Sequence, residues 1–124
     1  MSRWVVHSKV EFDAEHALTT YLGRPEEPHS HRWRVAIRVG AERLHPEGYA
    51  VDFHAVHQLL EETVAPFAGA DLNLDPEVGV PSPTAERLAE VVASRIVLRC
   101  RTLGARLLTV SVWEGPTNRV DLEL

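Results

Sequence analysis

The chain has 124 residues, of which 44% are hydrophobic and 25% charged, and this length predicts a single domain, residues 1–124, with a buried core. A formal net charge of −5 argues against a nucleic-acid partner, since such proteins usually carry a basic surplus. No apolar run reaches the roughly 18 residues of a membrane span, and the one cysteine, Cys100, excludes an internal disulfide. With no signal-peptide core near its start, the chain is predicted to be cytoplasmic, without a membrane partner.

The first third of the chain is predicted to be two strands joined by a loop. Apolar and polar residues alternate over residues 3–12, a period of two that is typical of a strand with one buried face. The alternation returns over residues 29–39, where His29 and His31 share a face. The intervening residues 18–28 are rich in proline, glycine and glutamate, which favours a loop.

Two helices are predicted in the middle of the chain. Asp52 is a suitable N-cap for a helix that runs to about Pro66, with apolar residues at helical spacing. Ser82 is the expected cap of a second helix, with Pro83 in its first turn and an end near residues 98–102.

Two further strands are predicted to close the chain. Alternation over residues 107–114 is followed by a Gly-Pro-Thr-Asn turn and a last strand over residues 120–124. The order strand, strand, helix, helix, strand, strand predicts an α+β fold, a four-stranded antiparallel sheet with two helices on one face. Such a sheet has two open edges, and pairing with another subunit is one way to protect them.

Three histidines are candidates for metal binding. His29 and His31 project from one side of a strand, and His16 ends the preceding strand segment, across the predicted hairpin. Three imidazoles on paired strands can hold one ion and leave a fourth position open for water or substrate, as in catalytic zinc sites. A His-x-His pattern is also common in ordinary surface or core positions, so spacing alone leaves both interpretations open.

These histidines lie in motifs that resemble the 6-pyruvoyltetrahydropterin synthases and the related 6-carboxytetrahydropterin synthases. Phe-Asp-Ala-Glu-His-Ala-Leu over residues 12–18 and His-Ser-His-Arg-Trp over residues 29–33 resemble the family's paired histidine motifs. The resemblance implies the tunnelling fold, in which three subunits form a barrel, two barrels stack into a homo-hexamer, and active sites lie between subunits. Further matches follow in order, at Val51-Asp52-Phe53, Asp71-Leu72-Asn73, Pro83-Thr84-Ala85-Glu86 and Val110-Ser111-Val112-Trp113-Glu114.

The resemblance also implies roles for five residues. His16, His29 and His31 match the three zinc ligands, and Glu114 matches the carboxylate that anchors the pterin. An ionised carboxylate can accept two parallel N–H hydrogen bonds from a guanine-like edge. Thr84 falls where the family holds the same ring at a helix start. Without the family, Thr84 would be assigned to the first turn of the helix and Glu114 to an ordinary strand end.

The family's catalytic groups have no counterpart in this sequence. The family places a cysteine four or six residues before the His-x-His motif, and these positions hold Pro25 and Gly23. The positions of its Asp-His pair hold Ala68 and Gly69. None of these side chains can donate or accept a proton, so we predict that the chain does not perform the synthase reaction. Cys100 lies far from the motifs and is expected to be a buried filler.

Three functions follow as hypotheses. The first is a binder of a pterin-like or guanine-like small molecule that retains Glu114 and lacks the synthase chemistry. The second is a zinc-dependent lyase or aldolase that acts on a dihydropterin with Glu26 or Glu27 as its base. The third is a structural oligomer with a vestigial pocket. Whether the three histidines bind zinc stays open. Ser30 replaces a family glycine, and a serine would be strained if the backbone at this position has a positive φ.

Overall fold

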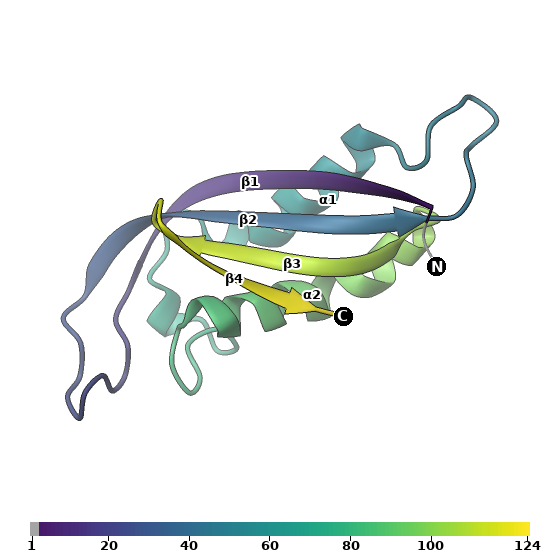
Figure 1. The fold of residues 1–124 in the computed structure, drawn as a ribbon. Coiled ribbons are helices and arrows are strands. Elements are labelled where there is room, and N and C mark those ends of the chain that lie inside the picture. Colours follow the sequence, from purple (N-terminus) through teal and green to yellow (C-terminus); the bar gives the residue numbers. More distant parts are fainter. Residues whose placement is uncertain (1–2) are drawn as a thin grey trace.

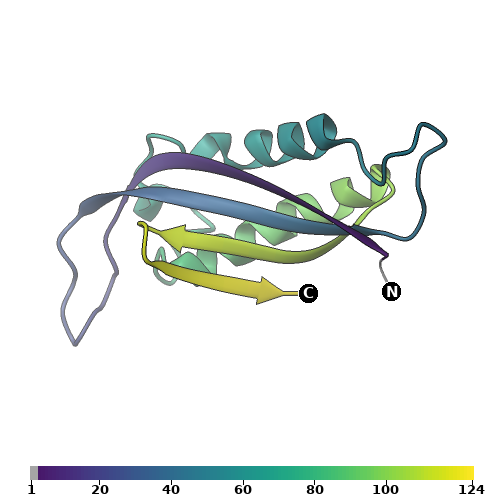
Figure 2. The same cartoon turned by 45° about the horizontal axis from the view of Figure 1, so that its top comes forward.

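The computed structural model describes residues 3–124 and confirms the predicted α+β fold. The strands form one antiparallel sheet in the order β1-β2-β3-β4. Both long helices lie on the same face of this sheet, as Figures 1 and 2 show. The elements are β1 (Trp4–His16), β2 (His29–Ala41), α1 (Phe53–Val64), the short 3-10 helices η1 (Ala65–Phe67) and η2 (Leu72–Leu74), α2 (Ala85–Thr102), β3 (Arg106–Glu114) and β4 (Asn118–Glu123).

The first strand ends at His16, as predicted, although the alternation identified in the sequence covers only residues 3–12. It continues past residue 12 to His16, because β1 and β2 pair without interruption from Trp4 opposite Ala41 to His16 opposite His29. Each added pair contributes ladder hydrogen bonds and cross-strand side-chain contacts, which hold this end in the extended conformation. As a result, two of the three candidate metal ligands lie directly across from each other.

One predicted helix start is right and the other is wrong. Asp52 caps α1, since its carboxylate accepts a hydrogen bond from the backbone N–H of His54 at 2.9 Å. The cap of α2 is Thr84 rather than Ser82, and its Oγ1 accepts from the Arg87 N–H at 3.0 Å. The Ser82 hydroxyl instead accepts from the N–H of Thr19 at 3.0 Å, so a contact with the hairpin loop takes it away from capping.

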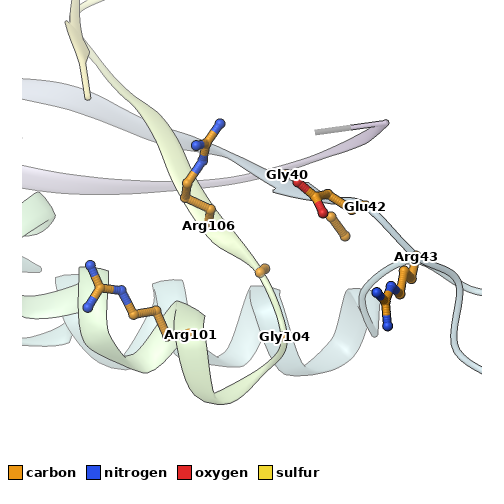
Figure 3. A pocket seen from close by; sticks show the side chains of 8 residues that line it. Gly40, Glu42, Arg43, Arg101, Gly104 and Arg106 are labelled. Carbon is orange, nitrogen blue, oxygen red and sulfur yellow. The ribbon is translucent and has the colours of Figure 1, made fainter. Parts of the chain in front are cut away.

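The end of the sheet where β2 finishes and β3 begins carries several charged side chains around a cavity. Arg43, Arg101 and Arg106 line this cavity of about 390 Å³ together with Glu42, as Figure 3 shows. Arg43 follows β2, Arg101 is in the last turn of α2, and Arg106 opens β3. This end is opposite to the one at which His16 and His29 pair, so the two ends of the sheet present different chemistry.

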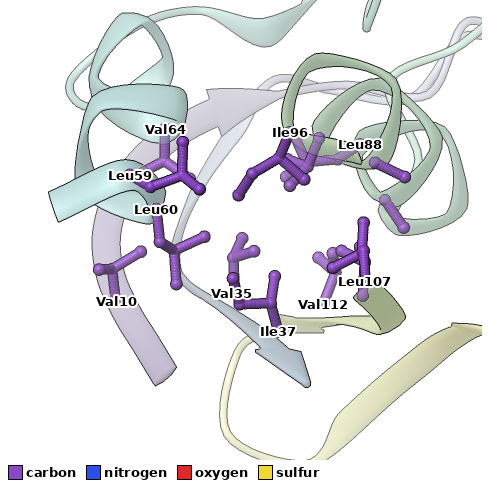
Figure 4. Packing of buried hydrophobic residues seen from close by; sticks show 14 of the residues in the cluster. Val10, Val35, Ile37, Leu59, Leu60, Val64, Leu88, Ile96, Leu107 and Val112 are labelled. Carbon is purple, nitrogen blue, oxygen red and sulfur yellow. The ribbon is translucent and has the colours of Figure 1, made fainter. Parts of the chain in front are cut away.

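The core fills the space between the sheet and the helices. α1 packs on β1, and α2 packs on β3 and β4. Burial of each large aliphatic side chain here stabilises the fold by about 1.5–3 kcal/mol. Cys100 lies in this cluster and is 1% exposed, which confirms its predicted role as a filler. Figure 4 shows the packing of Val10, Val35, Ile37, Leu59, Leu60, Val64, Leu88, Ile96, Leu107 and Val112.

The outer face of the sheet is polar. Arg34 donates to Glu11 at 2.8 Å across the β1–β2 pair, and Arg38 donates to Thr109 at 3.2 Å across the β2–β3 pair. The polar side chains of this face are therefore arranged as cross-strand pairs. Within residues 3–124, neither helix combines the length and the apolar character needed to cross a membrane.

Candidate functional site

The three candidate ligands His16, His29 and His31 gather at one end of the β1–β2 pair, on the face covered by the helices. Their ring centroids lie 4.6 Å (His16–His29), 5.3 Å (His16–His31) and 4.6 Å (His29–His31) apart. One nitrogen atom of each ring lies within 4.8 Å of the others, so the three could ligate a single ion. His16 is buried, while His29 and His31 are partly exposed, which leaves the cluster open on one side.

Backbone hydrogen bonds determine how two of these rings are protonated. The Nδ1 atom of His16 donates to the carbonyl of Pro83 at 2.8 Å, and that of His29 donates to the carbonyl of Glu27 at 2.9 Å. A carbonyl can only accept, so Nδ1 carries the proton in both rings and Nε2 of the neutral ring is free to bind a metal. This arrangement of outer hydrogen bonds is typical of metal-binding histidines.

The backbone of Ser30 permits this geometry. Ser30 lies in β2 opposite Glu15 of β1, and its φ is not positive, since Leu22 is the one non-glycine residue of positive φ among residues 3–124. The strain expected from replacing the family glycine is therefore absent. The substitution does not turn either neighbouring imidazole away from the cluster.

Trp33 closes the inner side of the cluster. Its side chain is fully buried, and its indole N–H donates to the carbonyl of Ala14 at 3.1 Å. The indole meets the imidazole of His16 edge to face, with 4.9 Å between ring centroids. Trp33 therefore provides an apolar floor that keeps water from one side of the histidines.

Glu114 ends β3 directly opposite Trp33, which brings its carboxylate to the histidines. Its Oε1 atom lies 2.8 Å from Nε2 of His16. Nε2 is fully buried and makes no well-aligned hydrogen bond within residues 3–124. A lone pair on Nε2 of His16 would repel a carboxylate oxygen at this distance. A proton or a metal cation on Nε2 would remove this repulsion.

The pKa values of this pair reflect their contact. The contact with His16 holds the pKa of Glu114 below its usual range, against the opposing effect of burial. Burial by itself lowers the pKa of His16, but the Glu114 carboxylate and the Pro83 carbonyl together outweigh it and raise that pKa. Burial lowers the pKa of His31. His31 therefore stays neutral and available as a ligand to lower pH than His16 does.

Glu114 also lines a cavity of about 280 Å³ beside the histidines. Thr84 lines the same cavity, so the structure brings together the two residues that the sequence suggested for pterin binding. The Thr84 hydroxyl also caps α2, so it lies at the N-cap rather than in the first turn, where the alternative interpretation placed it. Other residues line the cavity that no sequence argument had assigned to it: Leu18, Ala85, Glu86, Asn118, Arg119 and Val120.

The positions that correspond to the family's catalytic groups lie elsewhere. Gly23 has a φ of 82° and lies at the tip of the hairpin loop, in which Pro25 follows the Tyr21–Arg24 bridge. The N–H of Gly69 donates to the carbonyl of Asp13 at 2.7 Å, and Ala68 lines a different cavity beside α1. The structure therefore brings none of these four residues into the cavity of Glu114.

Of the two loop carboxylates considered as a base, Glu26 approaches the histidines. Its Oε1 atom lies 3.7 Å from Nε2 of His29, and it accepts a hydrogen bond from the N–H of Leu18 at 3.0 Å. The N–H of Glu26 in turn donates to the carbonyl of Leu18 at 3.0 Å. This reciprocal pairing fixes the carboxylate at the open side of the cluster, whereas Glu27 contributes its backbone carbonyl to His29.

The cluster fits a zinc ion by its chemistry. Zinc accepts three imidazole nitrogens and a further ligand in tetrahedral geometry. The buried Nε2 of His16, which has no well-aligned hydrogen-bond partner within the described chain, is the atom that a cation would satisfy. The residues that would hold the ion are His16, His29 and His31.

Comparisons with known proteins agree with this fold. A family model described as 6-pyruvoyl tetrahydropterin synthase matches residues 5–123. The solved 6-pyruvoyl tetrahydropterin synthase of Caenorhabditis elegans aligns with a TM-score of 0.77 at 15% identity, over 100% of this chain and 99% of that one. The enzyme of Plasmodium vivax aligns with a TM-score of 0.71 at 13% identity, over 98% of each chain. A variant of that enzyme, in which cysteine replaces a catalytic glutamate, aligns with a TM-score of 0.67 at 13% identity, over 98% of each chain. Curated protein sequences gave no match.

Proposed function

Because the chain belongs to the 6-pyruvoyl tetrahydropterin synthase family, we propose that it binds a pterin-like heterocycle in the cavity beside Glu114 without catalysing the synthase reaction. The observation that carries this proposal is that the Glu114 carboxylate contacts both the cavity and the histidine cluster. Its carboxylate lines the cavity together with Thr84 and at the same time lies 2.8 Å from His16 of the histidine cluster. A flat heterocycle bound to Glu114 would therefore extend toward the histidines.

The carboxylate of Glu114 is suited to this role by its charge and its exposure. Its lowered pKa keeps it ionised at neutral pH, and its side chain is 34% exposed, so it can be reached from the cavity. An ionised carboxylate can accept two parallel N–H bonds from the 2-amino and ring N–H groups of a guanine-like edge. The apolar side chains of Leu18 and Val120 line the same cavity and can contact the faces of a ring.

The proposed lack of synthase activity follows from the residues at three positions of the family's catalytic groups. Loss of one general acid or base typically lowers a rate by about 10²–10⁴-fold. Pro25 or Gly23 occupies the position of the family's cysteine, and Ala68 and Gly69 occupy those of its Asp-His pair. Cys100, the one thiol in the chain, is buried in the core and cannot replace the missing group.

We also propose that the three histidines hold zinc. When bound, the ion would act as a Lewis acid that polarises an oxygen of the ligand's side chain. The chain's own residues orient the site: Pro83 and Glu27 hold the rings of His16 and His29 by their carbonyls, and Trp33 excludes water from the inner side. Glu114 balances the positive charge of the cluster.

The proposed assembly is the homo-hexamer of the family, formed by single-domain chains in the cytoplasm. The cavity of Glu114 includes Asn118, Arg119 and Val120 of β4, which is an edge strand of the sheet. A cavity at an open sheet edge is completed if a second subunit pairs along that edge. Sedimentation of the purified protein tests this assembly.

Ligand titration tests the proposed function. We expect neopterin and 7,8-dihydroneopterin to bind the wild-type protein, and Glu114→Ala to weaken both by roughly 100-fold, because two charge-assisted hydrogen bonds are lost. Glu123→Ala removes a carboxylate from the far end of the neighbouring strand β4 and should leave binding unchanged. Equal affinity of wild type and Glu114→Ala would contradict the role of Glu114. Failure of every pterin to bind would favour the vestigial pocket.

A synthase assay tests the second half of the proposal. Incubation of 7,8-dihydroneopterin triphosphate with the zinc-loaded protein should give no 6-pyruvoyltetrahydropterin above the uncatalysed background. Formation of this product at ordinary enzymatic rates would show that groups other than those at Pro25, Ala68 and Gly69 move the protons.

One observation favours a second candidate, a zinc-dependent lyase that cleaves the side chain of a dihydropterin. The Glu26 carboxylate lies 3.7 Å from Nε2 of His29, within reach of an oxygen held at the cluster. In the enzyme of Plasmodium vivax a glutamate is a catalytic residue. By analogy, Glu26 would remove the proton from the C2′ hydroxyl of the side chain, and the C1′–C2′ bond would break as the C2′ oxygen becomes the carbonyl of glycolaldehyde. The electron pair of that bond would pass to C1′ and the dihydropterin ring, and the proton held by Glu26 would then be returned to C1′.

This candidate predicts turnover that depends on Glu26. Incubation of 7,8-dihydroneopterin with the zinc-loaded protein should release glycolaldehyde, and Glu26→Gln should abolish this release while leaving pterin binding intact. Glu27→Gln is the matched control, because its side chain is not the one that approaches His29. Release at equal rates from wild type and Glu26→Gln would remove Glu26 from the chemistry.

A further inference from the structure

We infer that Ser8, His57 and Glu61 form a second site, a nucleophilic one that cleaves small carboxylic esters. The three side chains meet where α1 packs on β1. The hydroxyl of Ser8 lies 3.1 Å from Nδ1 of His57, and Oε1 of Glu61 lies 2.7 Å from Nε2 of the same ring. A hydroxyl, an imidazole and a carboxylate in this order are the groups that activate a serine for attack on a carbonyl carbon.

The carboxylate of Glu61 determines which nitrogen of His57 carries the ring proton. An ionised carboxylate can only accept a hydrogen bond, so its contact with His57 favours a neutral ring that is protonated on Nε2. Nδ1 then has a free lone pair and accepts a hydrogen bond from the hydroxyl of Ser8. His57 can therefore take the proton of Ser8 as a general base, and Glu61 stabilises the imidazolium that results.

A strand and a helix carry the site, so its geometry does not depend on a loop. Ser8 lies between Val6 and Val10 at the two-residue spacing of one strand face, and both valines are buried. The side chain of Ser8 therefore points toward the helices, as theirs do. His57 and Glu61 lie one turn apart and share a face of α1. A second subunit that pairs along β1 would use backbone groups in the plane of the sheet, whereas the Ser8 side chain projects out of that plane.

A cavity of about 460 Å³ lies beside His57 and Glu61, and both residues line it. This volume suits a small ester, and the cavity shares no lining residue with the cavity of Glu114. Part of its wall is apolar and can contact an acyl group: Val10, Phe12, Val64 and Ala65. The ester site and the pterin site are therefore different parts of the chain, and the inference does not depend on whether a pterin binds.

Lys9 offers a positive charge at this cavity. It follows Ser8 in β1 and lines the cavity, and its flexible side chain can bring the ammonium group to a bound ester. Attack by the serine converts the carbonyl oxygen into an oxyanion, and a nearby cation stabilises this charge more in the transition state than in the ester. Lys9 is thus assigned to the oxyanion, and the apolar wall to the acyl group.

The reaction runs in two steps. Oγ of Ser8 attacks the carbonyl carbon of the ester while its proton passes to Nδ1 of His57. When the tetrahedral intermediate collapses, the bond to the alcohol oxygen breaks, the proton on Nδ1 goes to that oxygen, and the acyl group stays on Ser8. Water then attacks the acyl carbon and gives a proton to Nδ1, and this proton returns to Oγ as the carboxylic acid leaves. Ester and water thus give an alcohol and a carboxylic acid.

Covalent labelling tests the nucleophile directly. Diisopropyl fluorophosphate reacts with activated serines, releases fluoride and leaves a phosphoryl group whose mass is measured. We expect one label per chain, located on Ser8 by peptide mapping, and no label in Ser8→Ala. Ser94→Ala is the control and should be labelled like the wild type, because the hydroxyl of Ser94 donates to the carbonyl of Val91 rather than to an imidazole. Absence of a label on Ser8 in the assembled wild-type protein would overturn the inference.

Hydrolysis of p-nitrophenyl acetate gives a second readout. The protein is first treated with a chelator, so that a metal ion at the histidine cluster cannot contribute. We expect a burst of one nitrophenolate per chain, and His57→Gln should lower the rate by about 100-fold or more, since the general base is lost. His54→Gln changes an exposed histidine one turn earlier on α1 and should keep the wild-type rate. Hydrolysis that persists in Ser8→Ala, or that the chelator abolishes, would belong to other groups and contradict the inference.

Glu61 acts through His57, and its variants separate this positioning role from a structural one. Glu61→Gln should lower kcat by about tenfold with little change in KM, because a neutral carboxamide stabilises the imidazolium less. Glu62→Gln removes the partner of Arg99 instead and is the matched control, which should leave kcat unchanged. Chemical denaturation of each variant checks that it folds. Equal kcat values in wild type and Glu61→Gln would remove Glu61 from the site and refute the three-residue arrangement.

Discussion

Asn73 holds the main chain of Ala17 from both sides, although the two residues lie far apart in the sequence. Its side-chain Oδ1 accepts from the N–H of Ala17 at 2.8 Å, and its Nδ2 donates to the carbonyl of Ala17 at 2.8 Å. An asparagine side chain thereby imitates a neighbouring strand at the point where β1 ends. His16 directly precedes Ala17, so this contact helps to fix the position of a proposed metal ligand.

Replacement of Asn73 by alanine should therefore affect metal binding as well as stability. We expect the free energy of unfolding to fall by about 1–3 kcal/mol, because two hydrogen bonds are lost, and the affinity for zinc to fall by about 10-fold or more. Chemical denaturation and competition with a zinc chelator measure the two quantities. Gln58→Ala, which removes a side-chain hydrogen bond to Glu62 on the exposed side of α1, is the control and should leave zinc affinity unchanged. Unchanged zinc affinity in Asn73→Ala would show that Asn73 serves stability alone.

The contact of Asn73 also illustrates what the sequence could and could not predict. Alternation along β2 correctly placed His29 and His31 on one face, because the side-chain period of a strand is local. The register that sets His16 opposite His29, by contrast, depends on the pairing of β1 with β2, and the shift of the α2 cap from Ser82 depends on the hairpin loop. Contacts between distant segments decide such details, and no local pattern encodes them.

The residues of the candidate site were likewise predicted only in part from the sequence. Family motifs pointed to Glu114 and Thr84, and the structure places both in one cavity. Glu86 stood in a quoted motif without a role, since its place in the cavity depends on how α2 packs beside β4. The approach of Glu26 to His29 arises from its pairing with Leu18, which depends on the loop's conformation rather than on composition.

Thr84 caps α2 and has a proposed second role in pterin binding, and substitution can separate the two. Thr84→Ala should lower the free energy of unfolding by about 1 kcal/mol, because the N-cap of α2 is lost, and should also weaken pterin binding. Asp52→Ala removes the cap of α1, far from the cavity, and should cost similar stability without changing pterin affinity. Thr84→Ser retains the hydroxyl and should therefore keep both the stability and the pterin affinity of the wild type. If Thr84→Ala and Asp52→Ala bind pterin equally well, Thr84 is a helix cap only.

Cys100 should be chemically inert in the folded protein. Its side chain is 1% exposed, and burial raises the pKa of its thiol, so less reactive thiolate is present at a given pH than in an exposed cysteine. We expect a thiol reagent such as DTNB to label the native protein far more slowly than the urea-unfolded chain. Cys100→Ala should leave pterin and zinc binding intact, at a cost of about 1 kcal/mol in stability. Rapid labelling of the native protein would mean that the thiol is accessible.

The contact between Glu114 and His16 should give the metal-free protein a characteristic dependence on pH. The pKa of His16 is raised above 6.5, so the stabilisation from its proton is complete below pH 6.5 and is lost as the pH rises through the folded-state value. The pKa of Glu114 is lowered from 4.5, so its contribution is present above pH 4.5 and is lost as the pH falls through its folded-state value. Both groups are charged together between these limits.

Denaturation of metal-free wild type and Glu114→Gln across this range measures the effect. The difference in unfolding free energy between the two proteins should be greatest between pH 4.5 and 6.5 and should shrink toward both pH 3 and pH 9. Zinc must displace the proton on His16, so the pH at which zinc binding is half complete should also move downward in Glu114→Gln. Glu62→Gln is the control, since Glu62 pairs with Arg99 on the helices rather than with a histidine. A stability difference that stays constant from pH 4.5 to pH 9 would mean that Glu114 does not stabilise the charged form of His16.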